Sequence, residues 1–317
     1  ICPETMLQPA FSTYTATVFY NRYDVSSFLR EGENEVRVVL GSGWFNEPGD
    51  DCFDFEHAVW KARPQLICEL EANGRTVLVS DSSWLCAEGK TVYNSVRFGE
   101  DYDATLPEPE FEKAVVAKGP GGLLKEQPLP PIRIQRYLDP LRRDGRVFDF
   151  GSNTSGDVEI CVSGSRGERV RIIYGERLDS NGNVDQLEIK RHPTIPRNQV
   201  DHYTLAGDGK ETWHPSFSYK GFRYVQLEGN VKIHGIRARV FHTDLREAGG
   251  FRCSNETVES LMAAARNSTL TNFHHIPTDC PHREKNGWTG DAHVSSEQAL
   301  YNFDMKRAYL KYVDDIV

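Results

Sequence analysis

The sequence of 317 residues is 38% hydrophobic and 11% aromatic, a composition that supports packed cores and excludes extensive disorder. Its net charge of −9 argues against a nucleic-acid partner, because such a partner requires a basic surface. No apolar run approaches the ~18 residues of a membrane-spanning helix, so no membrane partner is expected.

Both ends of the sequence indicate a piece of a longer protein. The chain starts at Ile1 without a charged and then apolar leader, and it stops at Val317 inside a predicted helix. We expect any localisation signal to lie elsewhere in the whole protein, and we predict neither its compartment nor its oligomeric state.

Residues 1–106 are predicted to form an antiparallel, jelly-roll-like β-sandwich, because short β-branched and aromatic runs alternate there with turn-forming segments. Clear examples of these runs are YTATVFYNRYDV, NEVRVVLGSGWF, RPQLICELEA and RTVLVSD. Residues 107–131 follow and are rich in proline and glycine. Proline removes backbone donors and favours extended geometry, so this segment is predicted to be a linker that lies along a surface.

Residues 132–248 return to β-forming runs and are predicted to make a second antiparallel sandwich. Within them, DSNGNVDQ (179–186) looks like a calcium loop at first sight. Its glycine is not at the position that a helix–loop–helix calcium site needs, so a hairpin turn is predicted instead. The seven cysteines lack paired metal-type spacing, and those in QLICEL, SWLCAE and VEICVS are expected to be buried free thiols. A disulfide among the first four is left open.

From residue 249 the pattern becomes helical, and residues 249–317 are predicted to be all-α. Ser254 is the predicted N-cap of the first helix, and apolar residues recur after it at helical spacing. Residues 292–303 and 305–317 are predicted to be further helices. The intervening segment, 277–293, contains two prolines and two glycines that forbid a continuous helix and allow sharp turns, so it is predicted to connect the first two helices as a loop.

The sequence of this loop, PTDCPHREKNGWTGDAH, admits three interpretations. Five potential metal ligands lie in or near it: His274, His275, Cys280, His282 and His293. They lack the paired spacing of zinc sites, so no metal site is predicted. In a purely structural interpretation, Arg283 pairs with an aspartate and Asp291 caps the next helix.

The third interpretation is catalytic. Hydrolysis of a glycosidic bond needs one carboxylic acid that protonates the leaving oxygen and one carboxylate that acts from the opposite face. The acid must keep its proton near neutral pH, which burial and neighbouring carboxylates favour. Glu284 lies between Asp279 and Asp291, and Trp288 can supply a dry wall and a stacking face for a sugar. The spacing alone gives no distance between carboxylates, so inverting and retaining mechanisms stay open.

The segment DCPHREKNGWTGD resembles the signature of the bacterial α-L-rhamnosidases, glycoside hydrolase family 78, in its shorter form. The resemblance covers nearly the whole chain. YNRYDVSSFLREGENEVRVVLGSGWF looks like the family's N-terminal carbohydrate-binding-like sandwich, VFDFGSNTSGDVEICVSGSRGERVRIIYGERLDSNGN like its second β-domain, and FRCSNETVESL like the start of its (α/α)6 barrel. It implies a multidomain β plus α protein: two antiparallel β-sandwich domains followed by the first helices of a truncated barrel.

The resemblance also implies roles for residues of the loop. Glu284 corresponds to the general acid, Asp279 and Asp291 to carboxylates that hold the rhamnose, and Arg283 and Trp288 to pocket residues. The family inverts the anomeric carbon, and its general base lies far beyond the end of this sequence. The chain by itself is therefore expected to have little or no turnover.

Two departures from the family pattern limit these expectations. Relatives that bind rhamnose through the first sandwich use acidic or Asn residues beside a Gly-Trp turn to hold calcium, whereas the turn here is GSGWF (41–45). Calcium is expected in the first sandwich only if the acidic stretch GDDCFDFE (49–56) supplies oxygens, and no other cofactor is predicted. The barrel is also cut after its first helices, so their apolar faces are expected to lack partners.

The whole protein is therefore expected to be an inverting, exo-acting glycoside hydrolase that releases terminal α-L-rhamnose from glycans or glycosides, with a rhamnose-containing carbohydrate as its substrate. One alternative is a non-catalytic carbohydrate-binding or scaffold protein with a degenerate barrel. Another is a related glycosidase that acts on a different sugar. Neither the aglycone nor the linkage preference is predicted from the sequence.

Overall fold

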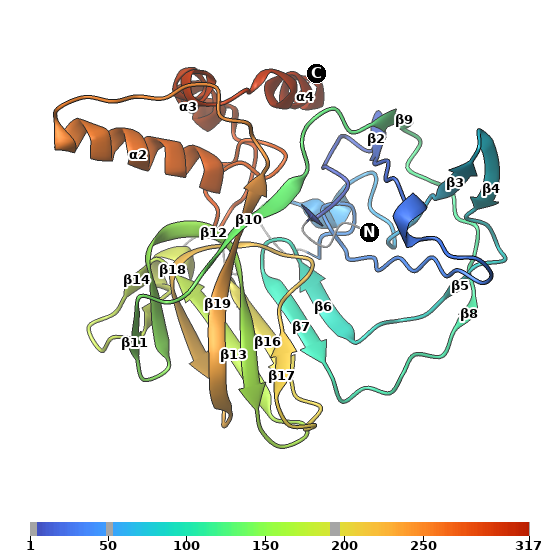
Figure 1. The fold of residues 1–317 in the computed structure, drawn as a ribbon, viewed down its shortest axis with the longest axis horizontal. Coiled ribbons are helices and arrows are strands. Elements are labelled where there is room, and N and C mark those ends of the chain that lie inside the picture. The colour runs from blue at the N-terminus through green and yellow to red at the C-terminus, as the bar shows by residue number, and fades with distance from the viewer. Residues whose placement is uncertain (1–4, 49–52, 191–196, 317) are drawn as a thin grey trace.

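A computed structural model describes residues 5–48, 53–190 and 197–316 of the chain. Its main feature is an 11-stranded sheet (Figure 1). The strands are β1 (Thr5–Met6), β6 (Thr91–Ser95), β7 (Gly99–Asp103), β10 (Ile132–Leu138), β11 (Arg142–Asp144), β12 (Val147–Ser163), β13 (Arg169–Gly175), β16 (Val200–Thr204), β17 (Glu211–Trp213), β18 (Lys220–Glu228) and β19 (Lys232–Thr243). They lie in the order β1-β10-β19-β12-β18-β13-β16-β7-β6, and β11 and β17 both pair with β12.

The largest core cluster lies on one face of this sheet. Val158, Ile160 and Val162 of β12 are all 0% exposed, and they share a face because side chains alternate along a strand. Ile172 of β13 and Ala238 of β19 are also 0% exposed in the same cluster. Full burial of each large aliphatic side chain stabilises the fold by roughly 1.5–3 kcal/mol, so this face is a major source of stability.

Strands β6 and β7 extend this sheet through a parallel pairing of β7 with β16, in which His202 lies opposite Asp101. The close approach requires a glycine, because a Cβ on Gly99 would lie 2.2 Å from the carbonyl oxygen of Val200. The Asp101 carboxylate holds the pair together through Arg197 (2.6 Å) and the His202 ring (2.7 Å). The predicted first β-domain therefore ends on strands that share the sheet of the predicted second one.

The rest of the N-terminal half contains small two-stranded sheets. Their strands are β2 (Thr17–Tyr20), β3 (Glu69–Ala72), β4 (Arg75–Val79), β5 (Leu85–Cys86), β8 (Glu112–Lys113) and β9 (Leu123–Glu126), accompanied by the 3-10 turns η1 (Ser26–Phe28) and η2 (Phe55–His57). The pairs are β2 with β9, β3 with β4, and β5 with β8. Because β8 and β9 belong to the predicted linker 107–131, that segment is extended and also pairs back onto the strands that precede it.

The predicted turn at residues 179–186 is a hairpin. It joins β14 (Arg177–Leu178) to β15 (Val184–Asp185), which pair in antiparallel fashion. The Asp179 carboxylate accepts hydrogen bonds from the amides of Asn181 (2.8 Å) and Asn183 (2.9 Å), which closes the turn. The hairpin prediction is confirmed.

The predicted burial of free thiols holds only in part. Cys68 and Cys161 are half-buried, whereas Cys86 is exposed, so the prediction for Cys86 is wrong. Its strand, β5, has only two residues, pairs only with the equally short β8, and exposes both of its own residues. Cys2 and Cys52 lie outside the described residues.

The chain ends in three helices, as predicted: α2 (Glu256–Thr271), α3 (Thr289–Asn302) and α4 (Lys306–Ile316), preceded much earlier by the short α1 (Leu187–Lys190). The three terminal helices lie together above one end of the main sheet (Figure 1). Apolar side chains on them are exposed, among them Leu261 (66%), Val294 (82%) and Leu310 (58%), which agrees with the expected lack of partners. Among the described residues, no helix combines the length and apolar character needed to cross a bilayer.

Helix α2 is capped by Asn255 and not by Ser254 as predicted. The Asn255 side-chain oxygen accepts hydrogen bonds from the amides of Thr257 (3.0 Å) and Val258 (3.3 Å). Both Ser and Asn are good capping residues, so composition does not separate the two positions. The extended backbone of Asn255 (φ −97°, ψ 109°) directly before the first helical residue does separate them.

Replacing this cap gives a direct test. Asn255→Ala is expected to lower the free energy of unfolding by about 1 kcal/mol, because two amides of the first turn lose their acceptor. Ser254→Ala is the matched control and is expected to change it little. Urea denaturation of the two variants measures the difference, and equal losses in both would contradict the assignment of the cap.

Candidate active site

The loop between α2 and α3 folds back on itself and packs onto the main sheet. The Asp279 amide donates to the Asn286 carbonyl (3.1 Å), and the Asn286 amide donates in return to Asp279 Oδ1 (3.1 Å). Pro281 covers Gly221 of β18 so closely that a Cβ on this glycine would lie 2.5 Å from the proline ring. The loop is thus held at its base and pressed against the sheet, which fixes the residues between these points.

Glu284 lies in this fixed part and is only 9% exposed. Its Oε2 accepts a hydrogen bond from the indole Nε1 of Trp288 (2.7 Å), and its Oε1 lies 3.7 Å from Nε of Arg283. The backbone amide of Glu284 donates to Sγ of Cys280 (3.3 Å). These contacts orient a largely buried carboxyl group between an aromatic donor and a cation.

Trp288 presents its ring to the surface while its nitrogen faces inward to Glu284. The residue is 48% exposed and lies directly before the first residue of α3. Its ring centroid is 6.4 Å from that of Phe53, at an interplanar angle of 67°. A half-exposed indole beside a buried carboxyl group is an arrangement that can stack against a sugar ring and exclude water from one side of it.

Asp279 shares the site with Glu284. Burial raises the pKa of the Asp279 carboxyl above its usual value, and the charge of Glu284 adds to the rise. Hydrogen bonds from Cys280 and from the Asn286 amide lower this pKa, but by less than burial raises it. Asp279 is half-buried and Glu284 is largely buried, so the loop brings together two carboxyl groups with little access to water.

Asp291 occupies a different position, exposed in the first turn of α3. A carboxylate there is favoured by the positive end of the helix dipole, which is the structural role that the sequence left open. It lies close to Tyr312, whose pKa is raised by burial and then by the charges of Asp315 and Asp291. The Tyr312 hydroxyl donates to the Gly287 carbonyl (2.8 Å), so Asp291 flanks the end of the loop.

The candidate metal ligands have separate environments. His274 stacks on Tyr219 with ring centroids 3.8 Å apart, and burial lowers its pKa well below the usual value. Burial lowers the pKa of His275 to about 3. Burial, and to a smaller extent the charge of Arg283, lowers the pKa of His282 to about 4. Within the described ranges, no three His, Cys, Asp or Glu side chains form a group that could hold a metal ion. Residues 49–52 of the acidic stretch 49–56 lie outside those ranges.

The residues that anchor the loop are not recognisable from the sequence. Lys285 is 0% exposed and Arg97, from a distant part of the chain, is 1% exposed. One guanidinium nitrogen of Arg97 donates to Oδ1 of Asn286 (2.5 Å). No local signal identifies them, because Lys and Arg are almost never fully buried and a polar loop gives no reason to expect otherwise.

Three family models match successive parts of the chain. The alpha-L-rhamnosidase N-terminal domain matches residues 2–136, the bacterial alpha-L-rhamnosidase concanavalin-like domain matches 140–243, and the bacterial alpha-L-rhamnosidase 6 hairpin glycosidase domain matches 246–317. The candidate site lies in the third of these regions.

Relatives with the same description are similar along nearly the whole chain. An alpha-L-rhamnosidase of Formosa agariphila is 32% identical over 98% of this chain and 35% of its own length. An alpha-L-rhamnosidase structure from Dictyoglumus thermophilum has 32% identity and a TM-score of 0.87 over 99% of this chain and 37% of that one. The structure of the Streptomyces avermitilis alpha-L-rhamnosidase complexed with L-rhamnose has 27% identity and a TM-score of 0.83 over 98% of this chain and 32% of that one. The chain thus spans about a third of the length of these relatives.

Proposed function

This chain belongs to the bacterial α-L-rhamnosidase family, and on that premise we propose that the protein containing it is an inverting glycoside hydrolase that releases terminal α-L-rhamnose from glycans or glycosides. The observation that carries the proposal is the environment of Glu284. Its carboxyl group is largely buried, is hydrogen-bonded to the Trp288 indole and shares the loop with Asp279.

Each residue of the site has a role in this mechanism. Glu284 protonates the leaving oxygen as the glycosidic bond breaks, and Trp288 walls the pocket so that the sugar ring stacks on it. Asp279, Arg283 and Asp291 hold sugar hydroxyl groups, and the two carboxylates also stabilise the positive charge that develops on the ring. The rest of the protein would supply the general base that activates water.

The test uses the full-length protein and 4-nitrophenyl α-L-rhamnoside. We expect release of rhamnose, and NMR of the first turnovers should detect the β anomer before mutarotation, because inversion converts an α linkage into a β product. 4-Nitrophenyl glycosides of other sugars are the controls and should be cleaved far more slowly. First appearance of the α anomer would contradict inversion.

Two further outcomes would favour the alternatives. Binding of rhamnose without hydrolysis of any rhamnoside would indicate a non-catalytic carbohydrate-binding protein. Faster cleavage of another glycoside than of the rhamnoside would indicate a glycosidase with a different substrate.

A further inference from the structure

Lys285 is the residue next to the proposed acid, and its side chain is fully buried beneath the loop. Its Nζ donates hydrogen bonds to three backbone carbonyl oxygens, those of Val96 (2.8 Å), Arg97 (3.1 Å) and Tyr219 (2.5 Å). It also lies 4.5 Å from the centroid of the Tyr219 ring. Burial, and after it the charge of Lys220, lowers the pKa of Lys285 well below its usual value. Three carbonyl acceptors oppose this effect, because they match the three N–H donors of an ammonium group, whereas a neutral amine would turn its lone pair to one of them.

The first two of these acceptors are held in place by the turn between β6 and β7. The Val96 amide donates to Oε2 of Glu47 (3.0 Å), and the Arg97 amide donates to Oγ of Ser95 (3.2 Å). Ser95 in turn donates to Oε1 of Glu47. The turn is buried, and its polar groups bind each other and Glu47. Two of the three carbonyl oxygens that surround the Lys285 Nζ, together called its socket, are therefore held rigidly.

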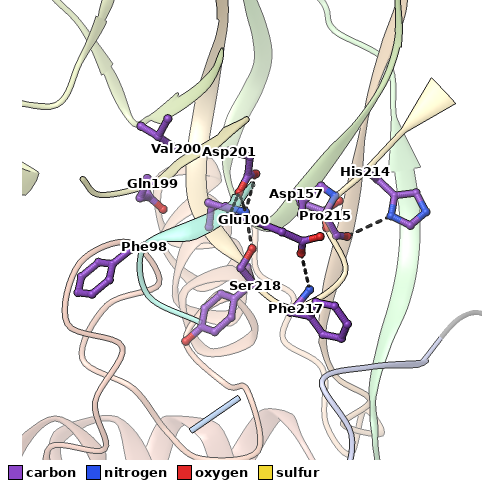
Figure 2. A network of polar contacts seen from close by, with 12 residues as sticks. Phe98, Glu100, Asp157, Gln199, Val200, Asp201, His214, Pro215, Phe217 and Ser218 are labelled. Carbon is purple, nitrogen blue, oxygen red and sulfur yellow. Dashed lines mark hydrogen bonds and ion pairs between the residues drawn. The ribbon is translucent and has the colours of Figure 1, made fainter. Parts of the chain in front are cut away.

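The third acceptor is held by a separate network, part of which is shown in Figure 2. Tyr219 lies between Ser218 and Lys220, and the Lys220 Nζ binds both the Ser218 Oγ (2.6 Å) and the Asp201 carboxylate (2.6 Å). Asp201 also accepts a hydrogen bond from the Glu100 amide (2.8 Å), and the Glu100 carboxylate accepts one from the Phe217 amide (3.0 Å). The socket for Lys285 is therefore built by two elements outside the helical region.

The backbone of the loop depends on this socket. Lys285 has a φ of +54°, in the left-handed region that a side chain with a Cβ disfavours, and such a conformation persists only when its surroundings hold it. The left-handed conformation of Lys285 reverses the chain directly after Glu284. The Lys285 side chain therefore points toward the sheet and binds the Tyr219 carbonyl, while the Glu284 carboxylate accepts a hydrogen bond from Trp288. The next residue, Asn286, is fixed independently by Arg97.

We propose that Lys285 is a positioning residue for the acid: the seating of its ammonium group on the carbonyl oxygens of Val96, Arg97 and Tyr219 holds the turn that aims the Glu284 carboxyl at the leaving oxygen. This inference rests on the proposed role of Glu284 as the acid. It makes the two β-regions part of the catalytic apparatus, because they supply the socket.

The test measures Lys285→Met in the full-length protein on rhamnosides whose leaving groups differ in their need for a proton. On phenyl α-L-rhamnoside, a poor leaving group, kcat should fall by about 10²-fold, as expected for an acid displaced by about an ångström. On 2,4-dinitrophenyl α-L-rhamnoside, which leaves without a proton, kcat should fall by less than about 3-fold. KM should change little on both, because the sugar contacts remain.

Lys311→Met is the matched control, because Lys311 is almost fully buried like Lys285 (1% exposed) and its ammonium pairs with Asp315 (2.5 Å) within helix α4. It should affect the two substrates equally. An equal loss on both substrates in Lys285→Met would overturn the positioning role. If that variant does not fold, Lys285→Arg, which keeps the charge but shifts the turn, is measured in the same way and judged by the same ratio.

Glu284→Gln, measured beside these variants, separates the two hypotheses. Suppose that kcat falls only on the poor leaving group in Glu284→Gln, while Lys285→Met shows no such dependence on the leaving group. That result would keep Glu284 as the acid and remove the role of Lys285. The absence of leaving-group dependence in Glu284→Gln would remove the acid assignment itself.

Discussion

Glu284→Gln in the full-length protein is expected to lower kcat on a poor leaving group by about 10²–10⁴-fold, the usual contribution of a general acid. The amide keeps the size of the side chain but has no proton to give. The hydrogen bond that Oε2 accepts from the Trp288 indole (2.7 Å) can be kept by the amide oxygen, so the pocket should retain its shape. KM is therefore expected to change little.

The rate of phenyl α-L-rhamnoside hydrolysis measures this effect, with Glu297→Gln as the control. Glu297 is exposed on α3, in the helical region that also holds the site, and its substitution should leave kcat unchanged. An added small anion such as azide should not restore the rate of Glu284→Gln, because an external nucleophile does not supply the missing proton. A normal kcat in Glu284→Gln on this substrate would remove the residue from the role of acid.

The position of the loop was predictable because the features that define it are local. Pro277 and Pro281 exclude a helix, and the structure has a loop between α2 and α3 as the sequence predicted. The predicted end of the loop at residue 293 is wrong, because α3 already begins at Thr289 and Gly290 lies inside it. The contact between Glu284 and Trp288 was not predicted. Their separation of four residues would bring them together on a helix, but in a loop it says nothing until the left-handed turn at Lys285 is known.

The anchoring of the loop could not be predicted from sequence. The carbonyl oxygens of Val96 and Arg97 that accept from Lys285 are 189 and 188 residues away from it, and any residue can supply a backbone carbonyl. The pairing of β7 with β16 has the same character, since it joins strands that lie about a hundred residues apart. Such long-range contacts are decided by packing of the whole chain and not by composition or periodicity.

Lys220→Met is expected to lower the free energy of unfolding by about 3–5 kcal/mol, because removal of one partner leaves the other charge buried and uncompensated. Lys220 and Asp201 form an ion pair at 2.6 Å, and both side chains are 0% exposed. The pair joins β18 to β16, and through the Glu100 amide it also holds β7. The sheet should therefore lose stability at the point where the first and second β-regions meet.

The midpoint of urea denaturation measures this loss, and Lys90→Met is the matched control because Lys90 pairs at 2.9 Å with Glu108, which is 88% exposed. An exposed pair contributes little, so the control midpoint should hardly move. Joint replacement of Lys220 and Asp201 by Met and Leu should recover part of the loss, since a buried pair can be replaced by apolar groups at small net cost. Equal midpoints for Lys220→Met and Lys90→Met would contradict the argument.

Because Lys220 also fixes the segment that carries the Tyr219 carbonyl, a folded Lys220→Met protein should show a weaker form of the leaving-group dependence expected of Lys285→Met.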